Sequence, residues 1–462
     1  CFHLKCYMTF DFQLMMIGGV DRAGNDATNE LSYLFLDALE ALGTPRDIAV
    51  RIHENTPPEF LRRASEVAKL GLGRPDFWND EITIESLTRL GISLEDARDY
   101  AAIGCVELTI PGKCNPRTMC HGMNLDKLLE LALNDGRDQI TGEQLGPRTG
   151  HALGSYDALH AAYRAQVTHF VDLAIEHDKR AFAAQPDVWP CPLGSSLVEG
   201  CVESGRGMLD GGATYNNAGV NVEAVANVAN SLAAIKSLVF DQVEITLADL
   251  RQALSNDFAD AEPLRQMLLN RAPKFGNDDD FVDEIARGEA AFYCGQVAEH
   301  RTPEGGHFAP LCFGTTSSQI YQFSPLTGAS ASGRRSCEPL SLSCTPPQGT
   351  DITGATASLA SVAKLDFARF GGGTSHIIDL HPTAVRDDSG TEKLAMLIRT
   401  FFDLGGMNVG ITVADEERLR DAQENPEAHR NVMVRVFGFS TQFVGLAPDI
   451  QEHVIAKTRH TQ

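Results

Sequence analysis

The chain is poor in positive charge. Its 462 residues include 39 lysines and arginines against 62 aspartates and glutamates, which gives a formal net charge of −23. Such a chain repels the phosphates of nucleic acids and the headgroups of anionic lipids. It also lacks a basic cluster with interleaved aromatic residues, the usual mark of nucleic-acid binding. We therefore expect no nucleic acid and no membrane among its partners.

Long apolar runs are missing as well. No uninterrupted hydrophobic stretch approaches the roughly 20 residues that a membrane-spanning helix needs. The apolar opening CFHLKCYMTFDFQLMMIGG contains a lysine and is followed by no small-residue cleavage site, so it does not have the pattern of a signal peptide. We expect a cytoplasmic protein. Because the first residue is Cys1 and not a methionine, we also expect the sequence to begin inside a longer protein.

The 11 cysteines show no disulfide framework. Their number is odd and their spacing is irregular, which favours reduced thiols over a disulfide scaffold. Cys105, Cys114, Cys120 and His121 could in principle gather a metal ion. Their spacing matches no common zinc pattern, so the sequence predicts no metal site.

Two segments have the apolar periodicity of helices. Residues 26–42 form the first, with Asp26 or Thr28 available as a cap, and residues 125–135 form the second, where Gly136 would end the helix.

Other segments predict a mixed fold. Residues 221–240 predict a long helix buried on more than one side, whereas short β-like runs lie at 376–380 and 408–413. The glycine- and proline-rich stretch 325–375 predicts a long irregular connection. No repeat of roughly 20–50 residues occurs, which excludes a solenoid. The class is α/β.

A cysteine followed two residues later by a glutamate occurs twice, as Cys105/Glu107 and Cys201/Glu203. Around Cys201, apolar residues recur at a spacing of four, which places this thiol on the apolar stripe of a helix. These apolar residues are Leu197, Val198 and Val202. We interpret Cys201 as a core cysteine.

Cys105 has different neighbours. Gly104 precedes it and the helix breakers Pro111 and Gly112 follow, which predicts an extended chain or a loop. In an extended chain, Cys105 and Glu107 would point to the same side. A carboxylate raises the pKa of a neighbouring thiol, which disfavours a thiolate nucleophile. The pair suits a reaction in which the sulfur transfers a hydrogen atom and the carboxylate transfers a proton. The alternative is that Cys105 is a half-buried loop cysteine with no catalytic role.

A second candidate for radical chemistry lies within residues 431–460. Gly438 stands between two phenylalanines, after a run of alternating valines that predicts a strand, and Pro448 opens a predicted helix. The strand valines are Val432, Val434 and Val436. Gly438 could serve a tight turn. It could also carry a radical, because a glycine α-carbon has no Cβ to prevent a planar radical shared with the flanking amide groups.

These segments resemble the glycyl radical enzymes of the pyruvate formate-lyase superfamily. VRVFGFSTQFVGLAPDIQEHVIAKTRH resembles the radical-bearing motif, with Gly438 as the radical glycine, and GCVE at 104–107 resembles the thiyl-cysteine loop of the dehydratase and lyase branch. The segment near GGATYNNAG resembles a non-catalytic part of the family. Further similar blocks are GNDATNELSYLFLDAL, LRQMLLNRAPKFGNDDD, GRRSCEPLS and RTFFDLGGMNVGITV.

The resemblance implies an α/β barrel of ten strands made of two half-barrels, with the loops that carry Cys105 and Gly438 meeting at its centre. Residues 1–340 would belong to the second part of the barrel and residues 341–462 would form a glycine radical domain. The first half-barrel would precede Cys1. The resemblance also implies a homodimer.

The resemblance further implies the chemistry. An activating radical S-adenosylmethionine enzyme with an iron–sulfur cluster would remove a hydrogen from Gly438, and the glycyl radical would take the thiol hydrogen of Cys105. The thiyl radical would then abstract a substrate hydrogen while Glu107 acts as general base. Turnover itself would need no small-molecule cofactor, and the oxygen sensitivity of the radical implies anaerobic metabolism.

The branch of the family is less defined. Val106 stands where pyruvate formate-lyase has a second cysteine, which disfavours formate C-acetyltransferase activity. We expect cleavage of a C–O, C–N or C–S bond in a small hydroxylated metabolite, with radical decarboxylation as an alternative. Met119 stands where diol dehydratases have an aspartate, whereas Thr118 matches a threonine of choline-type lyases.

Arg117, Thr118 and His121 are candidate substrate-binding residues, and Arg117 would suit an anionic substrate; an ordinary solvent-facing loop is the alternative. Two alternatives remain in which the chain does not catalyse a reaction by itself. The chain could be an inactive fragment that keeps the fold, or its C-terminal unit could act as a separate radical-bearing spare part. The presence of Cys105 and Glu107 argues against the spare part.

Overall fold

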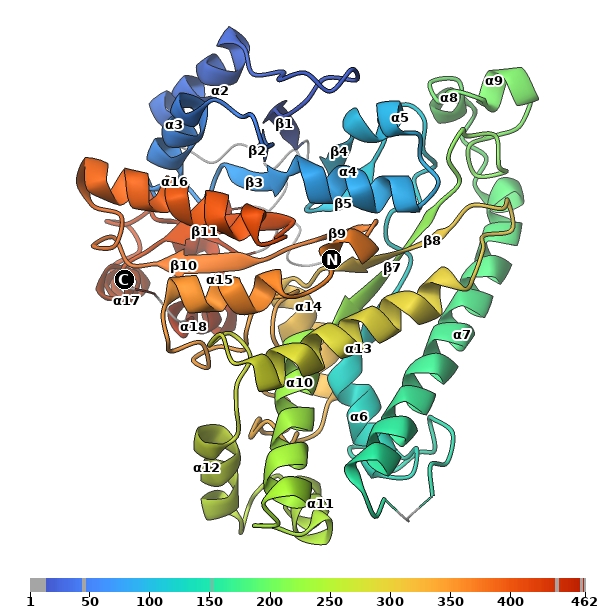
Figure 1. Ribbon diagram of the computed structural model, residues 1–462, viewed down its shortest axis with the longest axis vertical. Coiled ribbons are helices and arrows are strands. Elements are labelled where there is room, and N and C mark those ends of the chain that lie inside the picture. The colour runs from blue at the N-terminus through green and yellow to red at the C-terminus, as the bar shows by residue number, and fades with distance from the viewer. Residues whose placement is uncertain (1–13, 44–46, 151–152, 437–439, 458–459, 461–462) are drawn as a thin grey trace.

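The computed structural model describes residues 14–43, 47–150, 153–436, 440–457 and 460. Helices and strands are interspersed along these residues, which confirms the α/β class (Figure 1). The strands form two larger sheets and two small hairpins. No helix in this part of the chain is long and apolar enough to cross a membrane.

The first sheet joins the beginning of the chain to its C-terminal part. Its first three strands run parallel, the next strand pairs antiparallel with the third, and the last is parallel to the fourth. In spatial order they are β1 (Met15–Gly18), β2 (Ile48–Ile52), β3 (Asp76–Asn79), β11 (Asn408–Val413) and β10 (Ile377–Leu380). Two sets of parallel strands therefore meet with opposite directions at β3 and β11.

The second sheet is wholly parallel. Its order is β6 (Gly122–Asn124), β7 (Ala218–Glu223), β8 (Phe308–Cys312) and β9 (Gly373–Thr374). All six residues of β7 are buried, as expected for a parallel sheet covered on both faces. The hydroxyl of Tyr293 donates to the carbonyl of Val220 at 3.0 Å, which places helix α13 (Asp280–Ala298) against this sheet.

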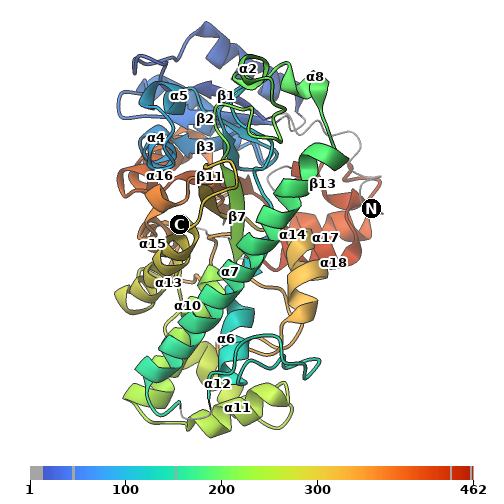
Figure 2. The same ribbon diagram turned by 90° about the vertical axis from the view of Figure 1, so that its right-hand side faces the viewer.

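The helices surround these sheets, and α7 runs along one side of the molecule (Figure 2). Besides α13, they are α2 (Glu30–Leu42), α3 (Pro58–Ala68), α4 (Asp80–Arg89), α5 (Leu94–Arg98), α6 (Leu125–Leu133), α7 (Tyr156–Val188), α8 (Pro192–Ser195), α9 (Cys201–Ser204), α10 (Val225–Ala234), α11 (Leu247–Ser255), α12 (Glu262–Arg271), α14 (Thr316–Ser318), α15 (Ala355–Ala363), α16 (Asp387–Asp403), α17 (Glu416–Glu424) and α18 (Pro448–Ile455). The hairpins are β4 (Ala101–Ile103) with β5 (Glu107–Thr109) and β12 (Met433–Arg435) with β13 (Ser440–Gln442).

Several predicted elements are confirmed. The runs at 376–380 and 408–413 form β10 and β11, and 125–135 contains α6, after which Gly136 has φ of +78°. The predicted helix at 26–42 is α2, but its predicted cap was wrong. Asn29 is the cap, because its side chain accepts from the third helical residue while that residue's hydroxyl accepts from the backbone of Asn29.

The prediction of one helix over 221–240 was also wrong. Residues 221–223 belong to β7, Ala224 turns the chain at φ of +62°, and α10 follows, continued by a π-helix at Ile235–Asp241. The strand prevails because residues 221–223 pair with β6 on one side and β8 on the other. The stretch 325–375 is irregular only in its first part, since α15 and β9 occupy the second.

The C-terminal segment has an apolar core of its own. This second core lies outside the main one and is built by α17, β12, α18 and their connections. Its buried residues are Ala414, Leu419, Ala422, Val432, Val434, Val436, Phe443, Leu446, Ile450, Val454 and Ile455. The predicted strand at 432–436 and the helix beginning at Pro448 are confirmed as β12 and α18. The domain boundary at 340/341 stays a prediction.

Candidate active site

Cys105 lies at the tip of a tight hairpin. Strands β4 and β5 pair antiparallel with Ile103 opposite Glu107, so that Gly104, Cys105 and Val106 form the turn. Gly104 adopts φ of +57°, a conformation that glycine reaches without strain. The Cys105 side chain is buried. The prediction of a loop around this cysteine is confirmed.

The carboxylate of Glu107 folds back onto this turn. Its Oε2 accepts hydrogen bonds from the backbone N–H groups of Cys105 and Val106, each at 2.9 Å. The two side chains therefore do not project together from an extended strand, as the sequence suggested; one carboxylate oxygen fixes the backbone beside the thiol. The other oxygen, Oε1, receives no hydrogen bond from the described residues.

The Cys105 hairpin lies between the two large sheets. On one side, the N–H of Ala102 points at the sulfur of Met16 on β1, at 3.1 Å. On the other side, the N–H of Leu108 donates to the carbonyl of Gly372, just before β9, at 3.1 Å. Both sheets therefore contribute to the position of the thiol.

A second hairpin carries the predicted radical glycine. Strands β12 and β13 pair with Arg435 opposite Ser440, and Gly438 lies in their connection, outside the described residues. The backbone N–H and hydroxyl of Thr316 both donate to the carbonyl of Val436, the hydroxyl at 2.7 Å. The chain is thus anchored two residues before Gly438.

A buried charge network anchors the same strand to the first sheet. The guanidinium of Arg435 donates to both carboxylate oxygens of Asp76 on β3 and, at 3.1 Å, to the carbonyl of Gly73. Arg74 donates to Asp76 at 2.6 Å and to Asp47 at 2.8 Å. Burial raises the pKa of Asp47. Two arginines and two aspartates alternate here, so the charges compensate one another away from water.

Sequence reasoning missed Glu223, at the end of β7. This carboxyl is fully buried, and burial raises its pKa well above the usual value. Its partners are amides: Asn221 donates at 3.1 Å, and Gln319 donates as well. Gln319 directly follows α14, which carries Thr316. A carboxyl group whose pKa is raised by burial therefore lies behind the segment that holds Val436. The signal in the sequence was a glutamate at the end of a run of strand residues.

Arg117 is committed to structural contacts. Its guanidinium donates to Gln185, Glu304 and the carbonyl of Leu209, each at 2.8 Å. It also lies 4.0 Å from the ring centroid of Phe182. The guanidinium that the sequence assigned to an anionic substrate is therefore already bound to protein groups. The contacts with Gln185 and Phe182 also hold the loop of Arg117 against α7.

Thr118 and His121 have different surroundings. Thr118 lines a cavity of about 30 Å³ together with Leu108 of the Cys105 hairpin and Gly372. His121 instead pairs with Asp178 on α7, at 2.6 Å between Nδ1 and Oδ2, and is not among the residues that line this cavity. Across the described part of the chain, no three His, Cys, Asp or Glu side chains group as metal ligands.

The second Cys-x-Glu pair has no comparable setting. Cys201 is buried at the start of the one-turn helix α9, which agrees with a core cysteine. The predicted apolar stripe was wrong, because Leu197 and Val202 are 75% and 69% exposed.

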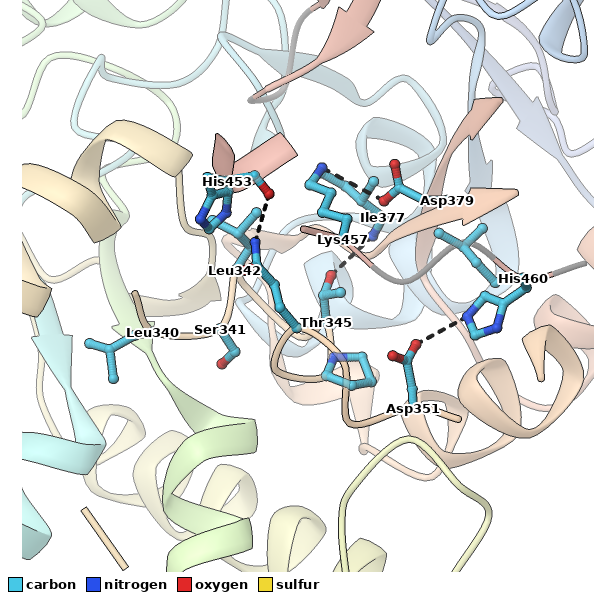
Figure 3. A pocket seen from close by; sticks show the side chains of 13 residues that line it. Leu340, Ser341, Leu342, Thr345, Asp351, Ile377, Asp379, His453, Lys457 and His460 are labelled. Atoms are coloured by element: carbon cyan, nitrogen blue, oxygen red, sulfur yellow. Dashed lines mark hydrogen bonds and ion pairs between the residues drawn. The ribbon is translucent and has the colours of Figure 1, made fainter. Parts of the chain in front are cut away.

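Another cavity, of about 40 Å³, lies between α18, β10 and residues 340–351 (Figure 3). Polar contacts cross it: His460 lies 3.1 Å from Asp351, and Lys457 lies 3.7 Å from Asp379. No residue of the Cys105 hairpin lines this cavity. It belongs to the contact between the C-terminal segment and the rest of the molecule.

Comparison with known families covers most of the chain. A model described as pyruvate formate lyase-like matches residues 7–322, and a model described as glycine radical matches residues 340–444.

Curated relatives match over nearly the whole chain. Trans-4-hydroxy-L-proline dehydratase of Clostridioides difficile is 34% identical over 98% of this chain and 57% of the relative. (2S)-3-sulfopropanediol dehydratase of Klebsiella oxytoca is 33% identical over 97% of this chain and 55% of the relative. The glycerol-bound structure of the B12-independent glycerol dehydratase from Clostridium butyricum matches with a TM-score of 0.94 and 41% identity, over 98% of this chain and 57% of that one. The chain spans little more than half the length of these relatives.

Proposed function

Because this chain belongs to the pyruvate formate lyase-like family and carries its glycine radical domain, we propose that it takes part in a radical elimination reaction. The substrate is a small hydroxylated metabolite, and a C–O, C–N or C–S bond is cleaved. The dehydratases among its relatives support elimination over acetyl transfer. Val106 beside Cys105 supports the same choice, since no second cysteine is available there to carry an acetyl group.

The radical is stored on Gly438. A radical S-adenosylmethionine activase with an iron–sulfur cluster removes one α-hydrogen, and the glycyl radical then takes the thiol hydrogen of Cys105. The burial of Cys105 supports this role, because a thiyl radical must be shielded from water and oxygen. The protein acts in the cytoplasm as a homodimer.

Substrate chemistry divides between two side chains. The Cys105 thiyl removes a hydrogen atom from a substrate carbon, and Glu107 takes the proton of the hydroxyl on that carbon while the neighbouring leaving group departs. The product radical then regains a hydrogen atom from Cys105. The single observation that carries this proposal is the turn itself, where Glu107 holds the cysteine backbone through Oε2 and keeps Oε1 for the proton.

Thr118 is kept as the proposed substrate contact, although the cavity of about 30 Å³ that it lines with Leu108 and Arg117 is lined by neither Cys105 nor Glu107. Arg117 is not included, since its donors are bound to protein groups.

Anaerobic electron paramagnetic resonance tests the proposal. The full-length protein is incubated with its activase and S-adenosylmethionine, with Gly438→Ala as the control. We expect a glycyl doublet that the control lacks, and loss of turnover but not of the radical in Cys105→Ala. Candidate hydroxylated substrates are then screened by mass spectrometry, where release of water, amine or sulfite supports elimination. Carbon dioxide or acetyl-coenzyme A as the product would favour decarboxylation or acetyl transfer, and a folded, activated protein without a doublet would be an inactive relative.

A further inference from the structure

Gly373, the first residue of β9, makes a close approach to the Cys105 turn. A Cβ built on Gly373 would lie 2.1 Å from the carbonyl oxygen of Val106, the residue after Cys105. Real Cβ atoms do not approach other atoms within 3.0 Å. Gly373 also has φ of +103°, a conformation that L side chains rarely adopt. Only glycine fits here without moving the turn.

The other two glycines of the FGGGT segment lie against other residues and not against the Cys105 turn. A Cβ on Gly371 would meet the side chain of Leu90, and a Cβ on Gly372 would meet Leu311 on β8. Gly372 nevertheless contributes to the same contact, because its carbonyl accepts the N–H of Leu108. The backbone of the Cys105 hairpin therefore packs directly against the backbone of Gly372 and Gly373.

We propose that Gly373 is a positioning residue for Cys105. The missing side chain at 373 sets how deeply the turn lies between the two sheets, and with it the distance over which a hydrogen atom passes between Cys105 and Gly438. This inference rests on the proposed function and adds to it a residue that neither touches substrate nor bears a radical.

The Cys105 turn should move as one unit. For this reason a contact at Val106 also affects the position of Cys105. Glu107 binds the N–H groups on both sides of the Cys105 carbonyl, so a push on Val106 also displaces Cys105. A methyl group at 373 must displace the Val106 carbonyl by about 1 Å to reach a normal contact distance. A misplacement of about 1 Å at a reacting group costs roughly a hundredfold in rate. The anchors of the other hairpin, Thr316 and Asp76, are untouched, so the radical should still form.

The rate of hydrogen exchange reports on this transfer step. When the Gly438 radical takes hydrogen from Cys105, the S–H bond breaks as the Cα–H bond forms, and the unpaired electron moves to sulfur; the reverse step restores the glycyl radical. In D2O the thiol carries deuterium, so repeated transfer replaces the α-hydrogen of Gly438. The resonance then changes from a doublet to a singlet, because the deuteron couples more weakly to the electron.

The experiment compares Gly373→Ala with Gly405→Ala in the activated full-length protein. Gly405 lies between α16 and β11, has φ of +101°, and would place its Cβ 3.8 Å from the carbonyl oxygen of Ala363, an ordinary contact distance. Both substitutions impose the same backbone strain, but only one pushes on the turn. We expect Gly373→Ala to form the doublet, exchange it at least tenfold more slowly and lose turnover in parallel, while Gly405→Ala behaves as the unsubstituted protein.

A second variant covers the case in which Gly373→Ala does not fold. Leu108→Pro replaces the N–H that donates to Gly372 by a ring carbon directed at the same carbonyl, so it separates the turn from Gly372 without a change at position 373. Slowed exchange with a retained doublet supports the proposal. Unchanged exchange in the folded variants overturns it, whatever happens to turnover. A missing doublet in the unsubstituted protein would instead overturn the proposed function, so the two failures are distinct.

Discussion

Arg435 and Asp76 form an ion pair that is fully buried, with Nη2 of the arginine 2.8 Å from Oδ2 of the aspartate. Arg435 ends β12, three residues before Gly438, and Asp76 begins β3 in the first sheet. The pair therefore links the strand that leads to Gly438, the proposed radical glycine, with the sheet that supports the Cys105 hairpin. Removal of one partner would leave the other charge buried and uncompensated.

The first prediction concerns this pair. Asp76→Asn should lower the free energy of unfolding by about 3–5 kcal/mol, because Arg435 and Arg74 both lose their shared carboxylate. Denaturant unfolding measures the change. The matched control is Asp388→Asn, which removes an exposed partner of Arg62 and should cost less than about 1 kcal/mol. Equal losses of stability in the two variants would contradict a special contribution of the buried ion pair to the free energy of unfolding.

The second prediction separates the two tasks of Glu107. Glu107→Gln keeps an oxygen that can accept the N–H groups of Cys105 and Val106 but cannot take a proton. Turnover should fall by roughly 10²–10⁴, the usual contribution of a general base, while the glycyl doublet and its exchange in D2O persist. Glu107→Ala should also slow the exchange, because the turn loses its carboxylate. Full turnover in Glu107→Gln would rule out the general-base role.

Local features of this molecule could be predicted from the sequence. The apolar runs that form β10 and β11 and the helical period of α6 were recognised, because short-range patterns encode them. The loop at Cys105 followed from the glycine and proline around it. Residues 221–223 were wrongly assigned to the helix that follows them, because a short segment that is buried on all sides suits a strand as well as a helix. Only pairing with β6 and β8 decides between the two.

The contacts that hold the candidate site in place could not be predicted from such local patterns. Asp76 and Arg435 are 359 positions apart, and Gly373 meets Val106 only because β9 lies beside the hairpin. The orientation of Glu107 toward the turn depends on two hydrogen bonds that a spacing of two residues does not specify. Sequence patterns thus suggest candidate reacting groups, whereas tertiary packing determines what holds them.

The third prediction tests Arg117. Arg117→Ala should lower the free energy of unfolding by about 3 kcal/mol or more, because Glu304 is left buried without its partner. Among the molecules that fold, KM for the substrate should stay within about twofold, since the guanidinium is bound to protein groups. The control is Arg430→Ala, whose ion pair with Glu427 is exposed. A large rise in KM without loss of stability would restore Arg117 as a substrate ligand.

The last prediction concerns Glu223, whose pKa is raised well above its usual value because the carboxyl is buried without a cation. In the folded protein it therefore keeps its proton to a higher pH than in the unfolded chain, where it ionises above pH of about 4.5. The folded state then holds one more proton, so this group's contribution to stability is complete at low pH and declines as pH rises, by about 1.4 kcal/mol per pH unit until the folded pKa is reached.

Glu223→Gln removes this ionisation and keeps groups that can hydrogen-bond to Asn221 and Gln319. The stability of the variant relative to the unsubstituted protein should therefore increase between pH 5 and pH 8, as measured by denaturant unfolding at each pH. Glu143→Gln, at an exposed position, controls for the loss of one carboxylate from the chain. A difference between the Glu223 variant and the unsubstituted protein that is constant with pH would mean that Glu223 is ionised in the folded state. The segment of Thr316 and Gln319, which anchors Val436, would then rest against a charge and not against a neutral acid.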